Sequence, residues 1–244
     1  MASFLDSMRL YITYKIRLYA KEEYRDQRLL LKESSVGTIF DVGAHIGESA
    51  IKYSRLFPSS KIYSFEPLPE SFRILQSRFK NSPRVIPIQA AVSNSEGIQQ
   101  LFSNVDSATN SLLPITSEAA QWADAPGSIQ LNQKVEVKTV TVDGFCRDRN
   151  IERVAILKMD IQGSELLALN GATGSLRERA ISLILCEMLF VPLYEGQAQF
   201  YQVCAFLESF GYSLYGLYNF AYSGGGQLKW CDGLFVSPDI QKTL

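Results

Sequence analysis

The stretch that decides the fold is T-I-F-D-V-G-A-H-I-G-E, Thr38–Glu48. A short β-branched and aromatic run ends on Asp41, and a loop bracketed by Gly43 and Gly47 follows it. Glu48 then opens an amphipathic helix that we expect to end near Pro58. A strand, a glycine-containing loop and a helix form the arrangement by which α/β proteins bind nucleotide-like ligands at a helix N-terminus.

The spacing of glycines in this loop indicates which class of ligand it can bind. A dinucleotide fingerprint reads G-x-G-x-x-G, and its middle glycine lets the backbone approach a pyrophosphate. This chain reads D-x-G-x-x-x-G, and it also lacks the Lys and Ser/Thr of a P-loop. The pattern therefore favours an adenosine ligand without phosphates. The carboxylate of Asp41 suits a ligand with a positive charge, held directly or through water.

The chain alternates between strand-like and helix-like segments on both sides of this stretch. We expect strands over 38–42, 61–66, 85–89, 154–160 and 181–187. We expect helices over 49–57, 70–79, 164–170 and 198–210, with glycines ending the last two. This alternation predicts a parallel sheet with right-handed crossovers.

Other segments depart from that alternation. The segments 212–218 and 229–236 have no helix between them and predict an antiparallel pair at the sheet edge. The segment 134–142 alternates strictly, which indicates a half-exposed strand, and 98–102 is a candidate short strand. The polar segment 103–133 is too long for an ordinary connection, so it is either a functional loop or partly disordered.

The N-terminal region reads as a separate helical extension over 1–35, before a single domain over 36–244. Apolar residues at spacings of three and four form one stripe, namely Leu5, Met8, Ile12, Ile16 and Tyr19. An ordinary amphipathic helix packed on the flank of the domain explains this stripe. A lid over the active site, a dimer contact and a membrane-surface helix are the alternatives.

The composition excludes several classes of protein. Hydrophobic residues make up 46% and charged residues 20% of the 244 residues, which is enough for a sizeable core. The net charge of −1 argues against a broad nucleic-acid interface. The cysteines are far apart and the chain has one histidine, which argues against a Cys/His zinc site. No apolar run is long enough to span a membrane, and we expect a cytoplasmic protein.

Acidic residues stand at the ends of four expected strands. They are Asp41, Glu66, Asp160 and Glu187. Ligands of open α/β sheets bind beyond the carboxyl ends of the strands, so four acids there would form one organised site. Glu66 stands 25 residues after Asp41. An acid near this spacing accepts hydrogen bonds from ribose hydroxyls in dinucleotide folds.

Five segments in order resemble the FkbM-type S-adenosylmethionine-dependent methyltransferases. They are D-V-G-A-H-I-G-E at 41–48, F-E-P-L-P-E-S-F at 65–72, A-A-V-S-N at 90–94, T-V-D at 141–143 and L-K-M-D-I-Q-G-S-E-L at 157–166. The resemblance covers about 36–190. It implies the Rossmann-like class I methyltransferase fold, a mostly parallel seven-stranded sheet with an antiparallel edge strand and helices on both faces.

The resemblance also implies roles for single residues in binding S-adenosylmethionine. Asp41, Gly43 and Gly47 would hold the methionine portion, with His45 inside the same loop. Glu66, followed by Pro67, would bind the ribose, Ala91 would lie near the adenine, and Asp160 would lie close to the transferring methyl group. Members of the family often have Asn where His45 stands and Glu where Gln162 stands.

The expected chemistry needs a nucleophile aligned with the methyl group and a base for its proton. The candidate bases are Asp160, Glu187, His45 and Tyr194, and we favour Asp160 and Glu187 because strand ends are rigid. For His45, contact with the cofactor or a helix cap is the favoured interpretation. A divalent metal such as Mg²⁺ on these acids is an alternative that we do not favour. The segment 107–114 is a candidate lid.

The sequence thus predicts a methyltransferase that modifies a hydroxyl group on a sugar or a polyketide-like small molecule. The alternatives are a methyltransferase acting on nitrogen or on a macromolecule, a nicotinamide-dependent oxidoreductase, and a non-catalytic scaffold. We expect no nucleic-acid partner and no transmembrane segment, and a homodimer is one of the oligomeric states left open.

Overall fold

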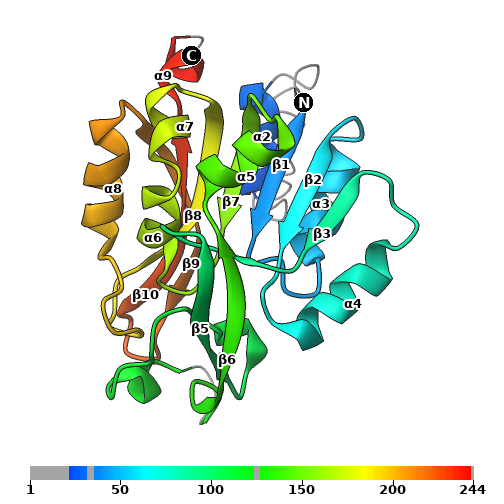
Figure 1. Ribbon diagram of the computed structural model, residues 1–244. Helices are drawn as coiled ribbons and strands as arrows, with labels where there is room; N and C mark the ends of the chain where they lie inside the picture. The colour runs from blue at the N-terminus through cyan, green and yellow to red at the C-terminus, as the bar shows by residue number, and fades with distance from the viewer. Residues whose placement is uncertain (1–21, 32–35, 124–126, 243–244) are drawn as a thin grey trace, which may run out of the picture.

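The computed structural model describes residues 22–31, 36–123 and 127–242. Its main sheet has seven strands in the order β3-β2-β1-β7-β8-β10-β9 (Figure 1). The strands of this sheet are β1 (Thr38–Val42), β2 (Lys61–Phe65), β3 (Val85–Ile88), β7 (Val154–Met159), β8 (Ile181–Leu189), β9 (Ser213–Tyr222) and β10 (Leu228–Val236). The five strands from β3 to β8 in this order are all parallel to one another. Strand β10 runs antiparallel to both of its neighbours, β8 and β9. The predicted sheet with its antiparallel edge is therefore confirmed.

Helices cover both faces of the sheet. They are α2 (Glu22–Leu31), α3 (Glu48–Leu56), α4 (Pro69–Phe79), α5 (Val142–Arg149), α6 (Glu165–Asn170), α7 (Thr173–Arg177), α8 (Phe200–Ser209) and α9 (Pro238–Gln241). In Figure 1, α5, α6 and α7 lie on the viewer's side of the sheet and α2 lies behind it.

Alternating strand residues divide the core into two layers. Phe40 and Leu157 belong to the layer beneath α5 to α8, whereas Ile39 and Ile156 belong to the layer beneath α2, α3 and α4. All four side chains are 0% exposed, as the period of two along a strand requires when both faces are covered.

A second sheet of three strands, in the order β4-β6-β5, lies outside the main one. Its strands are β4 (Ala91–Val92), β5 (Gly97–Asn104) and β6 (Leu131–Val140). The predicted strands 98–102 and 134–142 are therefore present, and they pair with each other over eight register positions from Gly97↔Thr139 to Asn104↔Leu131. Part of the segment 103–133 is ordered as two 3₁₀ turns, η1 (Ser107–Thr109) and η2 (Ala119–Trp122).

The described part of the N-terminal region is the helix α2, which packs against the sheet. Leu30 and Leu31 enter the core, and the hydroxyl of Tyr218 on β9 donates to Asp26 at 2.9 Å. The predicted apolar stripe from Leu5 to Tyr19 lies outside the described residues. None of the helices in the described part of the chain combines the length and the apolarity that crossing a bilayer requires.

Candidate functional site

The carboxyl ends of β1, β2 and β7 open into a cavity with about 960 Å³ of empty space, its open mouth included. The loop after β1 forms one side, and segments that follow β2, β3 and β7 form others. The wall also includes residues 107, 108 and 110–112 of the predicted lid segment. The polar residues that line this cavity include His45, Glu66, Ser107, Lys158, Asp160 and Gln162.

The two glycines of the loop have different structural tasks. Gly43 has φ 76°, and a Cβ atom there would collide with the backbone carbonyl of Asp160, so only glycine lets β1 and β7 end this close together. Gly47 has φ 91°, and a Cβ atom there would lie 2.6 Å from the ring of Phe79 on α4. Gly43 lines the cavity, whereas Gly47 lies behind it and allows α3 and α4 to pack.

Glu66 is held rigidly at the end of β2. One carboxylate oxygen accepts the backbone N–H of His45 at 2.9 Å, and the other accepts that of Leu68 at 2.9 Å. Burial raises the pKa of Glu66 to about 7, although both hydrogen bonds oppose this shift. Each oxygen has a further lone pair that can accept a ligand hydroxyl. This geometry suits the predicted contact with a ribose.

Asp41 is 0% exposed and does not line the cavity. The ammonium of Lys158 lies 3.5 Å from its Oδ1, donates to the carbonyl of Gly43 at 3.3 Å and lies 3.8 Å from Asp160. Burial alone would lower the pKa of Lys158, but the charges of Asp160 and Asp41 together raise it above the ordinary lysine value. An internal cation therefore already balances Asp41, and its predicted contact with a cationic ligand can only be indirect.

Lys158 is the main residue that the sequence analysis missed. Its signal was a lysine inside the apolar strand V-A-I-L-K-M, two positions before Asp160 and hence on the same side of the strand. The strand register places it directly opposite Asp41 on β1.

The two candidate bases, Asp160 and Glu187, are joined through Gln162. Its amide nitrogen donates to Asp160 at 3.0 Å and to Glu187 at 2.9 Å, and its oxygen accepts the hydroxyl of Tyr194 at 2.9 Å. An amide can donate to two carboxylates at once, whereas the glutamate often present in the resembling family could not. Burial, and then the charge of Asp160, raise the pKa of Glu187 well above the usual carboxyl range.

Access to the cavity separates these two acids. The side chain of Asp160 is 45% exposed and lines the cavity, whereas Glu187 is 8% exposed and lies behind Gln162. Tyr194 is buried, and its hydroxyl also lies 2.9 Å from the carbonyl of Thr109. Of the two favoured acids, Asp160 is thus the one with direct access to a ligand.

The segment 107–112 is attached to the site at several points. Ser107 lies 2.8 Å from the ring Nε2 of His45, and the hydroxyl of Ser111 donates to the carbonyl of Gln162 at 2.7 Å. His45 therefore joins the loop after β1 to the predicted lid, and it makes no side-chain cap on α3. Trp122 packs against the apolar cluster that contains Tyr194 and so anchors the insertion.

The structure brings most of the predicted ligand-binding residues together. Those that line the cavity are Gly43, His45, Glu66, Pro67, Ala91 and Asp160. Asp41 and Gly47 support the wall from behind. Within the residues that the structure describes, no three acidic, histidine or cysteine side chains are placed to hold a metal ion.

Comparisons with known proteins identify a family. The model of the methyltransferase FkbM domain matches residues 41–214. The chain is 25% identical over 198 residues to the 2-O-methyltransferase NoeI of Sinorhizobium fredii, covering 75% of this chain and 76% of that protein. It is 26% identical over 163 residues to the hexuronic acid methyltransferase AglP of Haloferax volcanii, covering 66% of this chain and 60% of that protein.

Among solved structures, similarity is found to Aeropyrum pernix fibrillarin in complex with S-adenosylmethionine. The TM-score is 0.46 at 14% identity, covering 82% of this chain and 66% of the other. The magnesium protoporphyrin IX methyltransferase of Synechocystis gives a TM-score of 0.46 at 9% identity, covering 91% of this chain and 81% of the other.

The pairing of Lys158 with Asp41 predicts a strong coupling in stability. Lys158→Met leaves the carboxylate of Asp41 buried without its cation, so we expect a loss of about 3–5 kcal/mol in the free energy of unfolding. The double variant Asp41→Asn/Lys158→Met should recover a large part of that loss. Urea denaturation of the wild type, both single variants and the double variant measures the coupling.

Lys138→Met, at an exposed position of β6 in the second sheet, is the matched control and should change stability little. Strictly additive losses from Asp41→Asn and Lys158→Met would show that the two side chains do not depend on each other.

Proposed function

The chain belongs to the FkbM methyltransferase family, and we propose that it transfers a methyl group from S-adenosylmethionine to a hydroxyl group of a sugar. The family match covers residues 41–214 and supports methyl transfer as the reaction. The observation that carries the choice of cofactor is Glu66. Its carboxylate is fixed by two backbone N–H groups, and it faces a cavity that extends from Ala91 to Asp160.

The cavity suggests how this chain holds its cofactor. In our proposal Glu66 accepts hydrogen bonds from the ribose hydroxyls, and the apolar wall that includes Ala91 and Leu101 takes the adenine. Gly43 lets the ends of β1 and β7 lie close together, and in our proposal the methionine portion lies along this loop beside Asp160. Asp41 supports the cofactor site indirectly. It pairs with the ammonium of Lys158, and that ammonium donates a hydrogen bond to the carbonyl of Gly43 in the loop that lines the cavity.

When bound, S-adenosylmethionine supplies an electrophilic methyl group on a sulfonium. The acceptor oxygen would form the new O–CH₃ bond as the methyl–sulfur bond breaks, and the electron pair of that bond would stay on sulfur. We assign the hydroxyl proton to Asp160, which lines the cavity, whereas Glu187 does not. Gln162 orients Asp160 by donating to its Oδ1, and we give Glu187 a positioning role through the same amide.

A sugar acceptor is the part of the proposal that comes from the relatives. NoeI is named a 2-O-methyltransferase and AglP a hexuronic acid methyltransferase. The first name specifies an oxygen as the acceptor atom and the second names a sugar acid, and a sugar hydroxyl is also the acceptor expected from the sequence. A cytoplasmic location and the absence of nucleic-acid partners stay predictions, and a homodimer stays one of the open oligomeric states. The boundary between an N-terminal extension over 1–35 and a methyltransferase domain over 36–244 also stays a prediction.

Glu66→Gln should weaken binding of S-adenosylhomocysteine about 10–100-fold, because hydrogen bonds to a charged group contribute about 1.5–3 kcal/mol. Wild-type affinity should also fall about tenfold from about pH 8 to about pH 6, because Glu66, with its pKa raised to about 7, becomes protonated and loses acceptor capacity as the pH falls. Isothermal titration calorimetry measures both effects.

The control is Glu70→Gln, an exposed change in the first turn of α4, which should leave affinity and its pH dependence as in the wild type. An unchanged affinity in Glu66→Gln would place the ribose elsewhere.

Transfer of a radiolabelled methyl group tests the function directly. We expect labelling of sugars from S-adenosylmethionine, and strong loss of labelling in Asp160→Asn because the proton loses its acceptor. Labelling of peptides or RNA alone would favour a macromolecular acceptor. Tight binding of NADH without binding of S-adenosylhomocysteine would favour an oxidoreductase, and no transfer to any class would favour a scaffold.

A further inference from the structure

A second cleft adjoins the cofactor cavity on the other side of Asp160. It has about 600 Å³ of empty space and lies between α2, the first half of α3, the end of β7 and residues within β8, β9 and β10. The two cavities share four lining residues, which are Glu48, Ser49, Lys158 and Asp160. A molecule in the second cleft could therefore contact Asp160, the proposed base, which also lines the cofactor cavity.

A buried carboxylate without a donor points into this cleft. Glu23 on α2 is 2% exposed and lines the cleft, yet it makes no hydrogen bond or ion pair with any residue in the described ranges. A buried acceptor without a partner costs free energy, and an ionised carboxylate can be satisfied only by a donor. The carboxylate of Glu23 is therefore available to accept hydrogen bonds from a ligand that brings hydroxyl or ammonium donors into the cleft.

A second carboxylate, Asp232 on β10, is held in a fixed orientation. The side-chain amide of Asn219 donates to it at 2.6 Å. Asn219 has φ 51° and lies at a register shift between β9 and β10, where Trp230 pairs with Ala221 but Asp232 pairs with Tyr218. A β-bulge of this kind redirects a side chain, here toward the cleft-lining acid.

Negative charge exceeds positive charge around the cleft. Four carboxylates line it, from Glu23, Glu48, Asp160 and Asp232, against the two lysines Lys52 and Lys158. Lys158 already faces Asp41 and Asp160, and Lys52 lies 5.3 Å from the ring centroid of Tyr24. No three acidic, histidine or cysteine side chains in the described ranges are placed to hold a metal ion.

We propose that this cleft is the acceptor subsite, and that its acceptor is a sugar with hydroxyl or amino donors and no carboxylate. The inference rests on the proposed function. It adds where the acceptor sugar binds and that this sugar carries no negative charge. Glu23 and Asp232 accept hydrogen bonds from the sugar, and the hydroxyl to be methylated lies next to Asp160. A sugar carboxylate would face the excess negative charge, so a hexuronic acid, named for the Haloferax relative, is disfavoured.

Three 4-nitrophenyl glycosides that differ in charge test the proposal with the full-length chain and radiolabelled S-adenosylmethionine. They are a glucoside, a 2-amino-2-deoxyglucoside and a glucuronide. We expect kcat/KM for the glucuronide to be at least about tenfold below that of the better of the other two. In Glu23→Gln/Asp232→Asn the preference against the glucuronide should shrink about tenfold, because two of the repelling charges are removed.

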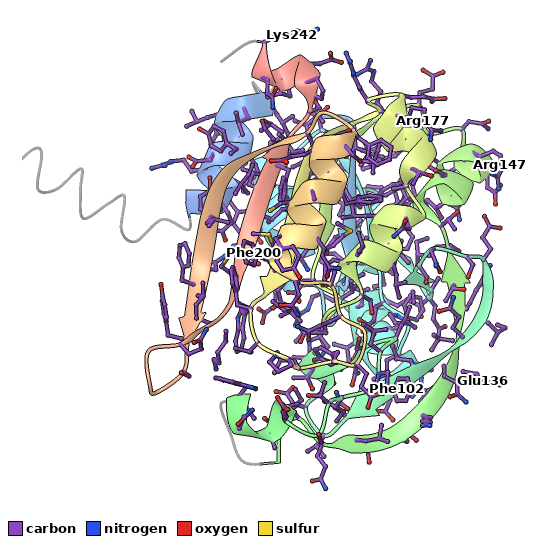
Figure 2. The ribbon with its side chains drawn as sticks, turned by 90° about the vertical axis from the view of Figure 1, so that its left-hand side faces the viewer. Phe102, Glu136, Arg147, Arg177, Phe200 and Lys242 are labelled. Atoms are coloured by element: carbon purple, nitrogen blue, oxygen red, sulfur yellow. The ribbon has the colours of Figure 1, made fainter. Side chains whose placement is uncertain are left out.

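The affinity for S-adenosylhomocysteine should be unchanged in the double variant, since neither residue lines the cofactor cavity. The matched control is Glu136→Gln, an exposed acid on β6 in the second sheet that should leave the preference intact (Figure 2). A merely structural defect would lower kcat/KM for all glycosides alike, and that result would overturn the inference.

The remaining outcomes separate the two proposals. Absence of S-adenosylhomocysteine binding contradicts the proposed function itself. Binding and methylation with an equally good glucuronide contradicts the acceptor subsite alone. Binding without methylation of any glycoside contradicts the sugar acceptor and, with it, this subsite.

Discussion

The ion cluster of Lys158 with Asp41 and Asp160 is the interaction on which the site depends. The parallel register of β1 and β7 places Lys158 opposite Asp41, where the lysine offsets a carboxylate with no access to water. The same ammonium donates to the carbonyl of Gly43, so the charge balance of the core also fixes the loop that lines the cavity. Because buried charges are costly when they lose a partner, this contact couples the stability of the sheet to the shape of the site.

Asp160 is the point at which two cavities meet. It lines the cavity that contains Glu66, and it also lines the polar cleft beside α2. Gln162 holds Asp160 while it also donates to Glu187, so an amide separates two acids that would otherwise repel each other. In our account this arrangement lets one exposed carboxylate face both the methyl donor and the hydroxyl that receives the methyl group.

Local patterns were enough to predict the elements next to the cofactor cavity. The strand before Gly43 and the place of Glu66 follow from short-range sequence signals, and the structure agrees with them. The expected position of the segment 107–114 near the site rests on the resemblance to the family, and residues 107, 108 and 110–112 do line the cavity. The ion pair of Asp41 and the packing role of Gly47 depend on β7 and α4, which no local pattern relates to the loop. The second cleft was missed for the same reason, since Glu23, Asn219 and Asp232 come from distant elements and form no motif.

A crystal structure of the protein with S-adenosylhomocysteine tests the central claim most directly. Our account predicts both ribose hydroxyls within hydrogen-bond distance of Glu66, the sulfur on the side of Asp160 and Lys158 still paired with Asp41. The second cleft should stay open beside the sulfur. A ligand bound without contact to Glu66, or with its amino-acid portion filling the cleft between Glu23 and Asp232, would contradict the account.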